Sequence, residues 1–409
     1  MSCENICNLG FGNDINPSSV KLSFTGNDGD LRITWNTVDI SQTPSILFAT
    51  EYFTPNGDEI FIGVEGTSDT YSINKGWSGY VNTGVLRGLE SYTTYYYAVG
   101  DKNQDIWSPT YNFTTGVLVY QRSVNPHSIV CYGDMGDAGG NEETIQNIMQ
   151  NIDNYSMVLH IGDIAYADSS KKGHQSTWDS FLNQINPISS HVPYMVCPGN
   201  HDTFAKGVVY KQTFNMPGKH NSYSYNINGI HYVSFSTEDD HLEGSHQYKW
   251  IEKDLKHFRA ENPDGWLVVW AHRPLYCSSS KKWCSHDENR LYYAKIYDHL
   301  FRKYNVDIFV SAHTHSYERT LPVYNQEVHG TYDNPKATVH FIIGTAGNRS
   351  GNVKGWEKVP VWSDGPRIEK NGFGVINFAN ETHLQWQFIE NSKNQVKDEV
   401  WVTKGYFNK

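Results

Sequence analysis

Five apolar, strand-like stretches of this sequence are each followed directly by an aspartate, an asparagine or a histidine. The polar stretches read GDMGD from residue 133, GDIAY from 162, PGNHD from 198, AHRP from 271 and SAHTHSYER from 311. Loops at the carboxyl ends of strands are where α/β folds assemble ligand sites. A single Gly-Asp after a strand is usually a turn, but five such loops in succession predict one shared site.

The side chains in these loops form a set of potential metal ligands. The oxygen and nitrogen donors are Asp134, Asp163, Asn200, His272, His313 and His315. Carboxylate, amide and imidazole donors without a thiolate suit zinc, manganese or iron. Six protein donors are too many for one catalytic ion that keeps open positions, but they suit two ions about 3.5–4 Å apart that share one carboxylate.

Tyr166 follows Asp163 by three residues, at a distance where both side chains can reach one point. A trivalent ion lowers the pKa of a phenol far enough to make it a ligand at acidic pH, and a phenolate stabilises the ferric state. A tyrosine packed into the core after a strand is the alternative interpretation, which would be favoured if Tyr166 stood alone. Beside the other donors, Tyr166 is more readily explained as a further metal ligand than as a core residue.

The elements that position these loops divide the chain into two parts. From about residue 15 to about residue 118, short alternating runs are broken by Gly, Asn and Asp, which predicts an antiparallel β-sandwich that resembles fibronectin type III. Strand-like and helical stretches then alternate, which predicts a layered α/β domain with a β-rich tail. We therefore expect an α+β chain with domains at residues 1–120 and 121–409.

Composition excludes several classes of protein. The chain has 409 residues, 38% of them hydrophobic and 19% charged, as in folded proteins of more than one domain. A net charge of −11 without a basic cluster argues against nucleic-acid binding. No apolar run approaches the ~20 residues of a membrane span, and the first residues lack the pattern of a secretory signal.

Cysteines and sequons favour an oxidising compartment. Cys277 and Cys284 flank a short loop that a disulfide could close, whereas the pairing of Cys3 and Cys7 is open. The N-x-S/T sequons, which are candidate glycosylation sites, begin at Asn112, Asn154, Asn348 and Asn380. We expect a secreted, lysosomal or vacuolar protein whose signal sequence is not present in this chain.

The motifs GDMG, GDIAYAD, GNHD, the histidine of AHRP and AHTHSYER resemble the five sequence blocks of the calcineurin-like metallophosphoesterases, and more specifically the purple acid phosphatases. The resemblance covers nearly the whole chain, including the β-rich N-terminal part and the closing FANETHLQWQF segment. It implies a dinuclear metal site at the carboxyl ends of strands in an α/β sandwich. It also implies an acid phosphatase that hydrolyses phosphate monoesters with a metal-bound hydroxide and without a covalent phosphoenzyme.

The resemblance distributes the ligands between an Fe(III) ion and a divalent zinc, iron or manganese ion. The ferric ion takes Asp134, Tyr166 and His315. The divalent ion takes Asn200, His272 and His313. Asp163 bridges the two ions.

The resemblance also implies roles for residues around the metals. His201 is expected to bind the phosphate and to protonate the leaving group. The plant enzymes have two further histidines after the fourth block, but the loop CSSSKKWCSHDENR departs from that pattern and offers His286 as our candidate for the same tasks. Asp168 is expected to orient a neighbouring side chain, and Glu318 to support the fifth block.

Other functions and partners remain open. A phosphodiesterase or nucleotide pyrophosphatase would share every ligand except Tyr166, and a catalytically inactive binding protein would usually have lost a ligand. The expected partners are small phosphate esters, and because family members are often dimers, a homodimer is a further prediction. Lys281 and Lys282 are expected to be solvated, but near the mouth of the site they would favour multiply charged phosphates.

Overall fold

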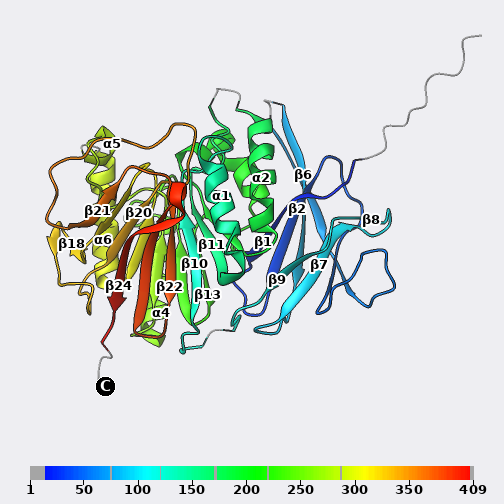
Figure 1. Cartoon of the computed structure of the whole chain (residues 1–409), viewed down its shortest axis with the longest axis horizontal. Helices are drawn as coiled ribbons and strands as arrows, with labels where there is room; N and C mark the ends of the chain where they lie inside the picture. Colours follow the sequence, from blue (N-terminus) through cyan, green and yellow to red (C-terminus); the bar gives the residue numbers. More distant parts are fainter. Residues whose placement is uncertain are drawn as a thin grey trace, which may run out of the picture.

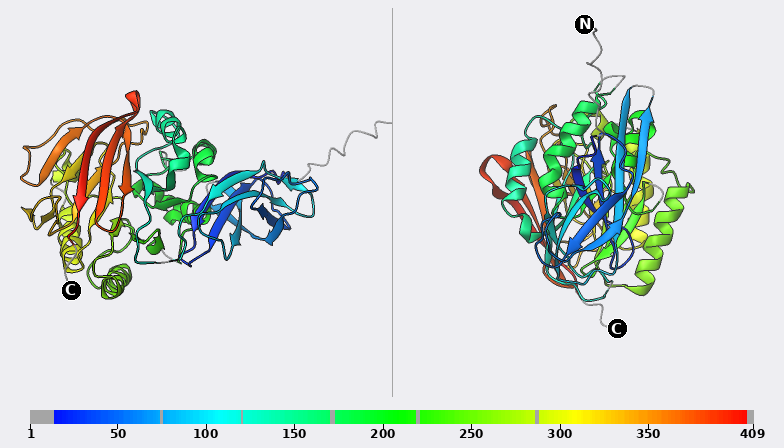
Figure 2. Two further views of the ribbon diagram at one scale, coloured as in Figure 1. Left: turned by 60° about the horizontal axis from the view of Figure 1, so that its bottom comes forward. Right: turned by 90° about the vertical axis from the view of Figure 1, so that its right-hand side faces the viewer.

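The computed structural model describes residues 14–73, 76–119, 121–169, 173–218, 221–285 and 288–405. Two parts lie end to end in the molecule, a β-sheet part built from the N-terminal segment and a larger α/β part (Figures 1 and 2). The expected boundary at residue 120 falls between the last strand of the first part, which ends at Thr114, and the first strand of the second, which begins at His127. That boundary stays a prediction.

Within the described residues, the N-terminal part forms two antiparallel sheets, as predicted. One sheet has the order β1 (Ser18–Phe24), β2 (Leu31–Thr37), β6 (Trp77–Leu86) and β5 (Thr67–Ile73). The other has the order β4 (Ile62–Glu65), β3 (Pro44–Ala49), β7 (Thr94–Asp101) and β8 (Ile106–Trp107), with β9 (Tyr111–Thr114) also paired to β7. Alternate residues of β2 (Leu31, Ile33 and Trp35) are buried between the sheets, as expected for a sandwich.

The α/β part contains two mixed sheets. The first has the order β12 (Tyr194–Cys197), β11 (Tyr155–Ile161), β10 (His127–Tyr132), β22 (Gly372–Phe378), β23 (His383–Glu390) and β24 (Gln395–Thr403). The second has the order β13 (Tyr223–Ile227), β14 (Ile230–Ser234), β15 (Leu267–Trp270), β16 (Ile308–Ser311), β20 (Val339–Ile343), β17 (Tyr317–Thr320) and β21 (Ser363–Ile368). β10, β11 and β12 are parallel to one another, as are β14, β15, β16 and β20.

Helices lie on the outer faces of both sheets but leave β24, at the edge of the first sheet, largely exposed (Figure 1). Those beside the first sheet are α1 (Asn141–Met149), α2 (Gln175–Ser189) and α3 (Val208–Thr213). Those beside the second are α4 (His246–Glu261), α5 (Lys282–Ser285) and α6 (Glu288–Lys303). Strand alternation explains the layers, because Cys131 and Leu159 pack between the sheets while Val130 and Val158 pack against α2. The second part is therefore a layered α/β sandwich, as expected.

Strand β1 joins the two parts by packing against α2. Val20 N donates to Asn186 Oδ1 at 2.6 Å, and Ser189 Oγ returns a hydrogen bond to Val20 O at 2.7 Å. Tyr97 Oη donates to Ser190 O at 2.6 Å. These bonds bind the β-sandwich to the helix layer, on the side of the first sheet. In the described residues, no helix combines the length and apolar character that a membrane crossing requires.

Candidate metal centre

The predicted ligands follow the carboxyl ends of five strands that lie side by side within the two sheets. Asp134, Asp163, His272 and His313 are each the second residue after their strand, which is β10, β11, β15 or β16 respectively. Asn200 is the third residue after β12. Because parallel strands end at the same edge of a sheet, this common spacing carries the donors to one place between the two sheets.

The loops that carry these donors adopt an unusual backbone conformation. Asp134, Asp163, Tyr166 and His313 have positive φ angles of 60°, 50°, 53° and 64°. Residues other than glycine rarely adopt this left-handed region, and they cluster there at functional sites. Local sequence preference does not select these conformations, so the surrounding sheets must hold them.

Two glycines let the loops approach each other. A Cβ on Gly199 would lie 2.3 Å from Asp163 Oδ1, and a Cβ on Gly162, whose φ is +73°, would lie 2.7 Å from His272 Nδ1. Any side chain at either position would push a predicted ligand out of the site. The Gly before Asp163 and the Gly before Asn200 are therefore part of the site itself.

The predicted ferric ligands converge on one point. Tyr166 Oη donates to Asp134 Oδ1 at 2.9 Å and lies 3.0 Å from His315 Nε2. His315 Nε2 is 3.1 Å from the same Asp134 oxygen. The phenol, the carboxylate and the imidazole thus present their donor atoms to a common centre.

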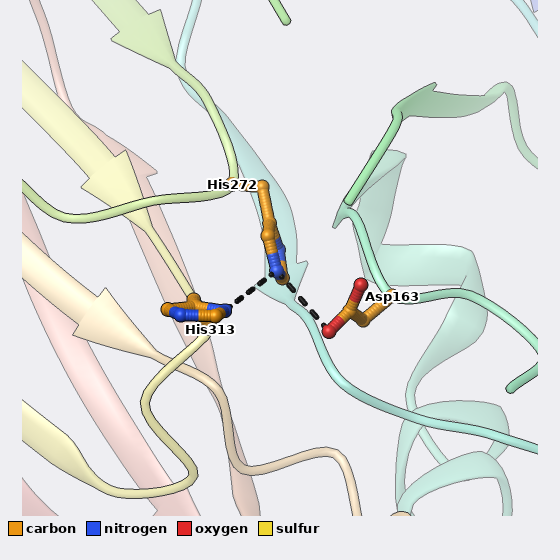
Figure 3. A group of neighbouring side chains, drawn as sticks. All are labelled: Asp163, His272 and His313. Atoms are coloured by element: carbon orange, nitrogen blue, oxygen red, sulfur yellow. Dashed lines mark hydrogen bonds and ion pairs between the residues drawn. The ribbon is translucent and has the colours of Figure 1, made fainter. Parts of the chain in front are cut away.

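Two of the predicted divalent ligands, His272 and His313, form a second group with Asp163 (Figure 3). His272 Nε2 lies 3.2 Å from Asp163 Oδ2 and 3.2 Å from His313 Nδ1. Asp163 Oδ2 also lies 3.5 Å from Tyr166 Oη. One oxygen of Asp163 is therefore within reach of both groups, which is the position that a bridging carboxylate needs.

Backbone carbonyls orient two of the imidazoles. His272 Nδ1 is 2.9 Å from Ile161 O, and His315 Nδ1 is 3.0 Å from Gly351 O. A ring nitrogen beside a carbonyl oxygen carries the proton, so the Nε2 atoms keep their lone pairs for a metal. Both Nε2 atoms are the ones that face the other donors.

The charges of these groups depend on each other. Burial opposes the charged form of His272, but Asp163 and Asp134 raise its pKa to about 10. Burial likewise opposes ionisation of Asp134, but His315 and His272 hold its pKa well below the usual range. Buried carboxylates here share protons with imidazoles, and metal binding at such a cluster displaces those protons. The donor set therefore fits metal ions.

His201 lies at the edge of the cluster, and Asp168 contacts it. His201 Nδ1 is 2.9 Å from Asp168 Oδ1, and the His201 ring centroid is 4.4 Å from that of Tyr166. The His201 backbone N–H donates to Asp163 Oδ1 at 2.8 Å. Partial burial lowers the pKa of His201, but Asp168 and Asp163 outweigh it and raise the pKa to about 9. Asp168 thus holds one ring nitrogen and leaves Nε2 available to a substrate.

Glu318 does not contact the predicted ligands in the described structure. It accepts hydrogen bonds from Ser278 N at 2.9 Å, from Ser278 Oγ at 2.5 Å and from Ser363 Oγ at 2.6 Å. Glu318 therefore holds the loop that follows the fourth motif. His286, our candidate for substrate binding in that loop, lies outside the described residues, as do Cys3 and Cys7.

One glycosylation candidate is wrong. Asn348 is only 4% exposed, and its Nδ2 donates to Asp134 O at 3.1 Å. The same Nδ2 lies 3.3 Å from His315 Nδ1. A glycan would have to be attached to a buried atom that already bonds the backbone of Asp134, so Asn348 supports the loop of that predicted ligand instead.

Sequence reasoning missed Arg273, which sits between the predicted divalent ligands and a carboxylate. Arg273 Nη2 lies 3.4 Å from Asn200 Oδ1, and Nη1 lies 3.2 Å from His313 Nε2. On its other side Arg273 pairs with Glu238 at 2.7 Å. The place of Arg273 in the AHRP motif was the available signal, whereas Glu238 lies 35 residues away and carries no local signal.

Known protein families match the chain in three segments. The N-terminal domain of purple acid phosphatases matches residues 17–115, and calcineurin-like phosphoesterase matches residues 127–317. The family described as iron/zinc purple acid phosphatase-like protein C matches residues 337–399. Together these matches cover both sheets of the N-terminal β-sandwich and every loop that carries a predicted ligand.

Similar proteins extend over nearly the whole chain. Acid phosphatase type 7 of Mus musculus is 30% identical over 424 residues, which cover 95% of this chain and 91% of that protein. Purple acid phosphatase 18 of Arabidopsis thaliana is 30% identical and covers 94% of this chain and 84% of that protein. The structure of a purple acid phosphatase from yellow lupin (Lupinus luteus) seeds superposes with a TM-score of 0.86 at 25% identity, over 97% of this chain and 76% of that one. The protein is a metal-dependent phosphoesterase, and the chain belongs to the purple acid phosphatase family.

Proposed function

We propose that this purple acid phosphatase hydrolyses phosphate monoesters at a dinuclear centre of Fe(III) and divalent zinc, iron or manganese. Asp134, Tyr166 and His315 are the proposed ferric ligands, with Asp163 as the bridge. The proposed divalent ligands are Asn200, His272 and His313. The observation that carries this proposal is the phenol of Tyr166, which lies within 3.0 Å of both Asp134 Oδ1 and His315 Nε2.

The metal pair, when bound, supplies an activated water and neutralises the charge of the phosphate. The protein fixes the geometry of the reaction through the loops at the strand ends. Neither of the buried thiols Cys131 and Cys197 reaches the site as a nucleophile, because both are fully enclosed in the sheet core. We infer that water attacks phosphorus directly, in line with the ester oxygen.

His201 protonates the leaving alkoxide in this proposal. Asp168 accepts a hydrogen bond from His201 Nδ1–H, so the ring is held and its Nε2–H is the group available for donation. The aromatic ring of Tyr166 packs beside His201 and restricts its movement. A positioned imidazole of this kind accelerates proton transfer by about 10²–10⁴-fold.

We also propose a secretory or lysosomal location. The disulfide between Cys277 and Cys284, with a Cα–Cα distance of 5.6 Å, is characteristic of an oxidising compartment. Asn154 and Asn380 are exposed, and Asn112 is half-buried, so these three sequons remain glycosylation candidates. A homodimer stays a prediction.

The visible absorption spectrum tests the ferric half of the proposal. The oxidised, metal-loaded protein should be purple through phenolate-to-iron(III) charge transfer, and Tyr166→Phe should lose or strongly weaken the band. A colourless, metal-replete and active wild-type protein would contradict a ferric tyrosinate. Turnover of a phosphate diester at a higher rate than the matching monoester would instead favour a phosphodiesterase.

A further inference from the structure

A large aromatic side chain lies exposed beside the predicted divalent ligands. Trp283 is 38% exposed, and its ring centroid lies 6.2 Å from that of His313 at an interplanar angle of 65°. Trp401 is similarly exposed at 47%, but it lies on β24 and contacts His383 instead. What sets Trp283 apart is its position, because its exposed ring lies next to a predicted metal ligand and offers a π-face for stacking there.

The loop that carries Trp283 is held at both ends. Cys284, the next residue, is fully buried and is joined to Cys277 by the disulfide. Glu318 holds Ser278 through two hydrogen bonds. A loop fixed in this way presents the indole in one place, which reduces the entropy lost when a ligand stacks on it.

A second loop braces this one. Ser279 forms a β-bridge with Trp356, and Ser280 N donates to Gly355 O at 3.1 Å. The bracing loop also contacts the metal centre, because Val353 N donates to His315 O at 2.9 Å. The loop of Trp283 is therefore tied by backbone hydrogen bonds, through the bracing loop, to the segment that carries His315.

We propose that Trp283 determines substrate specificity by stacking on a flat aromatic group in the leaving alcohol of the phosphate monoester. This inference rests on the proposed function. The Trp283 ring lies 6.2 Å from that of His313, so the alcohol of a phosphate ester bound at the donors would come within reach of the indole. The preferred substrates are thus monoesters of a nucleoside or of a phenol, since both offer the same π-face to an indole.

The neighbouring lysines do not account for this preference. Lys281 and Lys282 precede Trp283 directly, and Lys282 is exposed. Their positive charge attracts any phosphate ester, whether its alcohol is aromatic or aliphatic. Only the ring distinguishes the two classes of ester, so a comparison of matched substrates isolates its contribution.

The experiment compares the metal-loaded wild-type enzyme with Trp283→Ala, Trp283→Phe and Trp401→Ala. Adenosine 5′-monophosphate is paired with ribose 5-phosphate, and phenyl phosphate with glycerol 2-phosphate. Trp283→Ala should lower the ratio of kcat/KM for the aromatic ester to that for its partner by roughly tenfold, which corresponds to about 1.4 kcal/mol of stacking free energy. Trp283→Phe should retain part of the wild-type preference for the aromatic ester, and Trp401→Ala should retain all of it.

The two pairs distinguish the sources of the aromatic ring. A fall in the adenosine ratio alone assigns a nucleoside, a fall in the phenyl ratio alone assigns an aryl ester, and a fall in both assigns aromatic monoesters in general. Unchanged ratios for both pairs would overturn the proposal. An equal loss on all four substrates with loss of bound metal would do so too, because Trp283 would then support the centre rather than the substrate.

A binding measurement separates this inference from the proposed function. The non-hydrolysable phosphonate analogue of adenosine monophosphate should quench tryptophan fluorescence of the wild type, and Trp283→Phe should lose that part of the quenching. A wild-type enzyme that hydrolyses none of the four monoesters would sink the proposed function. Equal quenching in the wild type and Trp283→Phe would sink only the role of Trp283.

Discussion

The two halves of the metal centre differ in charge. Asp134, Tyr166 and His315 surround one point with a carboxylate, a phenol and an imidazole, all within 3.1 Å. Apart from the shared Asp163, the other half offers the amide of Asn200 and the imidazoles of His272 and His313. Anionic donors stabilise the more highly charged ion. The difference supports the proposed assignment of the trivalent ion to the first half and of the divalent ion to the second.

Loss of Asp163, the carboxylate that the two halves share, should weaken metal binding in both halves. Asp163→Ala removes the oxygen that lies 3.2 Å from His272 Nε2 and 3.5 Å from Tyr166 Oη. Both ions should bind weakly, and kcat should fall by on the order of 10³-fold or more, since metal ions contribute several kcal/mol of transition-state stabilisation. Metal analysis and monoester turnover measure the effect. Asp153→Ala, a change at an exposed aspartate, is the matched control, and retention of one full equivalent of metal in Asp163→Ala would contradict a bridging role.

Replacement of His201 should leave both halves loaded and impair proton transfer. His201→Ala should lower kcat for an alkyl phosphate by about 10²-fold, with a much smaller effect on p-nitrophenyl phosphate, whose leaving group needs no proton. Asp168→Asn should show the same pattern more weakly, because Asp168 only positions the ring. An equal loss on both substrates would show that His201 does not act as the proton donor.

Replacement of Arg273 should lower metal affinity in the divalent half of the centre only. Arg273→Met removes the group beside Asn200 and His313, and loss of such supporting contacts lowers metal affinity by about 10–100-fold. The divalent ion should be lost on dialysis while iron stays, as elemental analysis would show. Arg273→Lys should keep an intermediate amount. Equal loss of both metals would mean that the two halves are not independent in this way.

A buried histidine outside the metal centre can be compared with His272, whose pKa is raised by neighbouring carboxylates. His340 is buried in β20 without a carboxylate partner, and burial lowers its pKa to about 3. Because the unfolded chain binds this proton near the ordinary pKa of 6.5, His340 stabilises the fold less as the pH falls from 6.5 toward 3. The cost is roughly 2 kcal/mol between pH 7 and pH 5.

His340→Phe should therefore reduce the loss of stability that acidification causes. Denaturant unfolding of the wild type and the variant at pH 7 and pH 5 measures this difference. The buried His160, whose pKa burial also lowers to about 3, contributes equally to both proteins and cancels. If the free energy of unfolding falls equally in the wild type and in His340→Phe between pH 7 and pH 5, the prediction is wrong.

The sequence was sufficient to predict the fold, and it named donor residues that the structure brings close together. Alternating β patterns and the later alternation of strands and helices predicted the two sheets of the sandwich and the α/β layers. The donors could be named because each follows an apolar strand within a few residues, and parallel strands bring their ends together. These signals are local, so they are visible without knowledge of the tertiary structure.

Only the tertiary structure decided which distant residues support those ligands. Glu238 pairs with Arg273, and Asn348 bonds to the loop of Asp134, from positions 35 and 214 residues away. Local sequence likewise does not indicate that Glu318 holds the Trp283 loop, nor that Trp283 lies against His313. Contacts of this kind depend on how two sheets are stacked and where their loops meet. The reacting groups are thus encoded in short motifs, whereas their electrostatic surroundings and the substrate-facing surface arise from long-range packing.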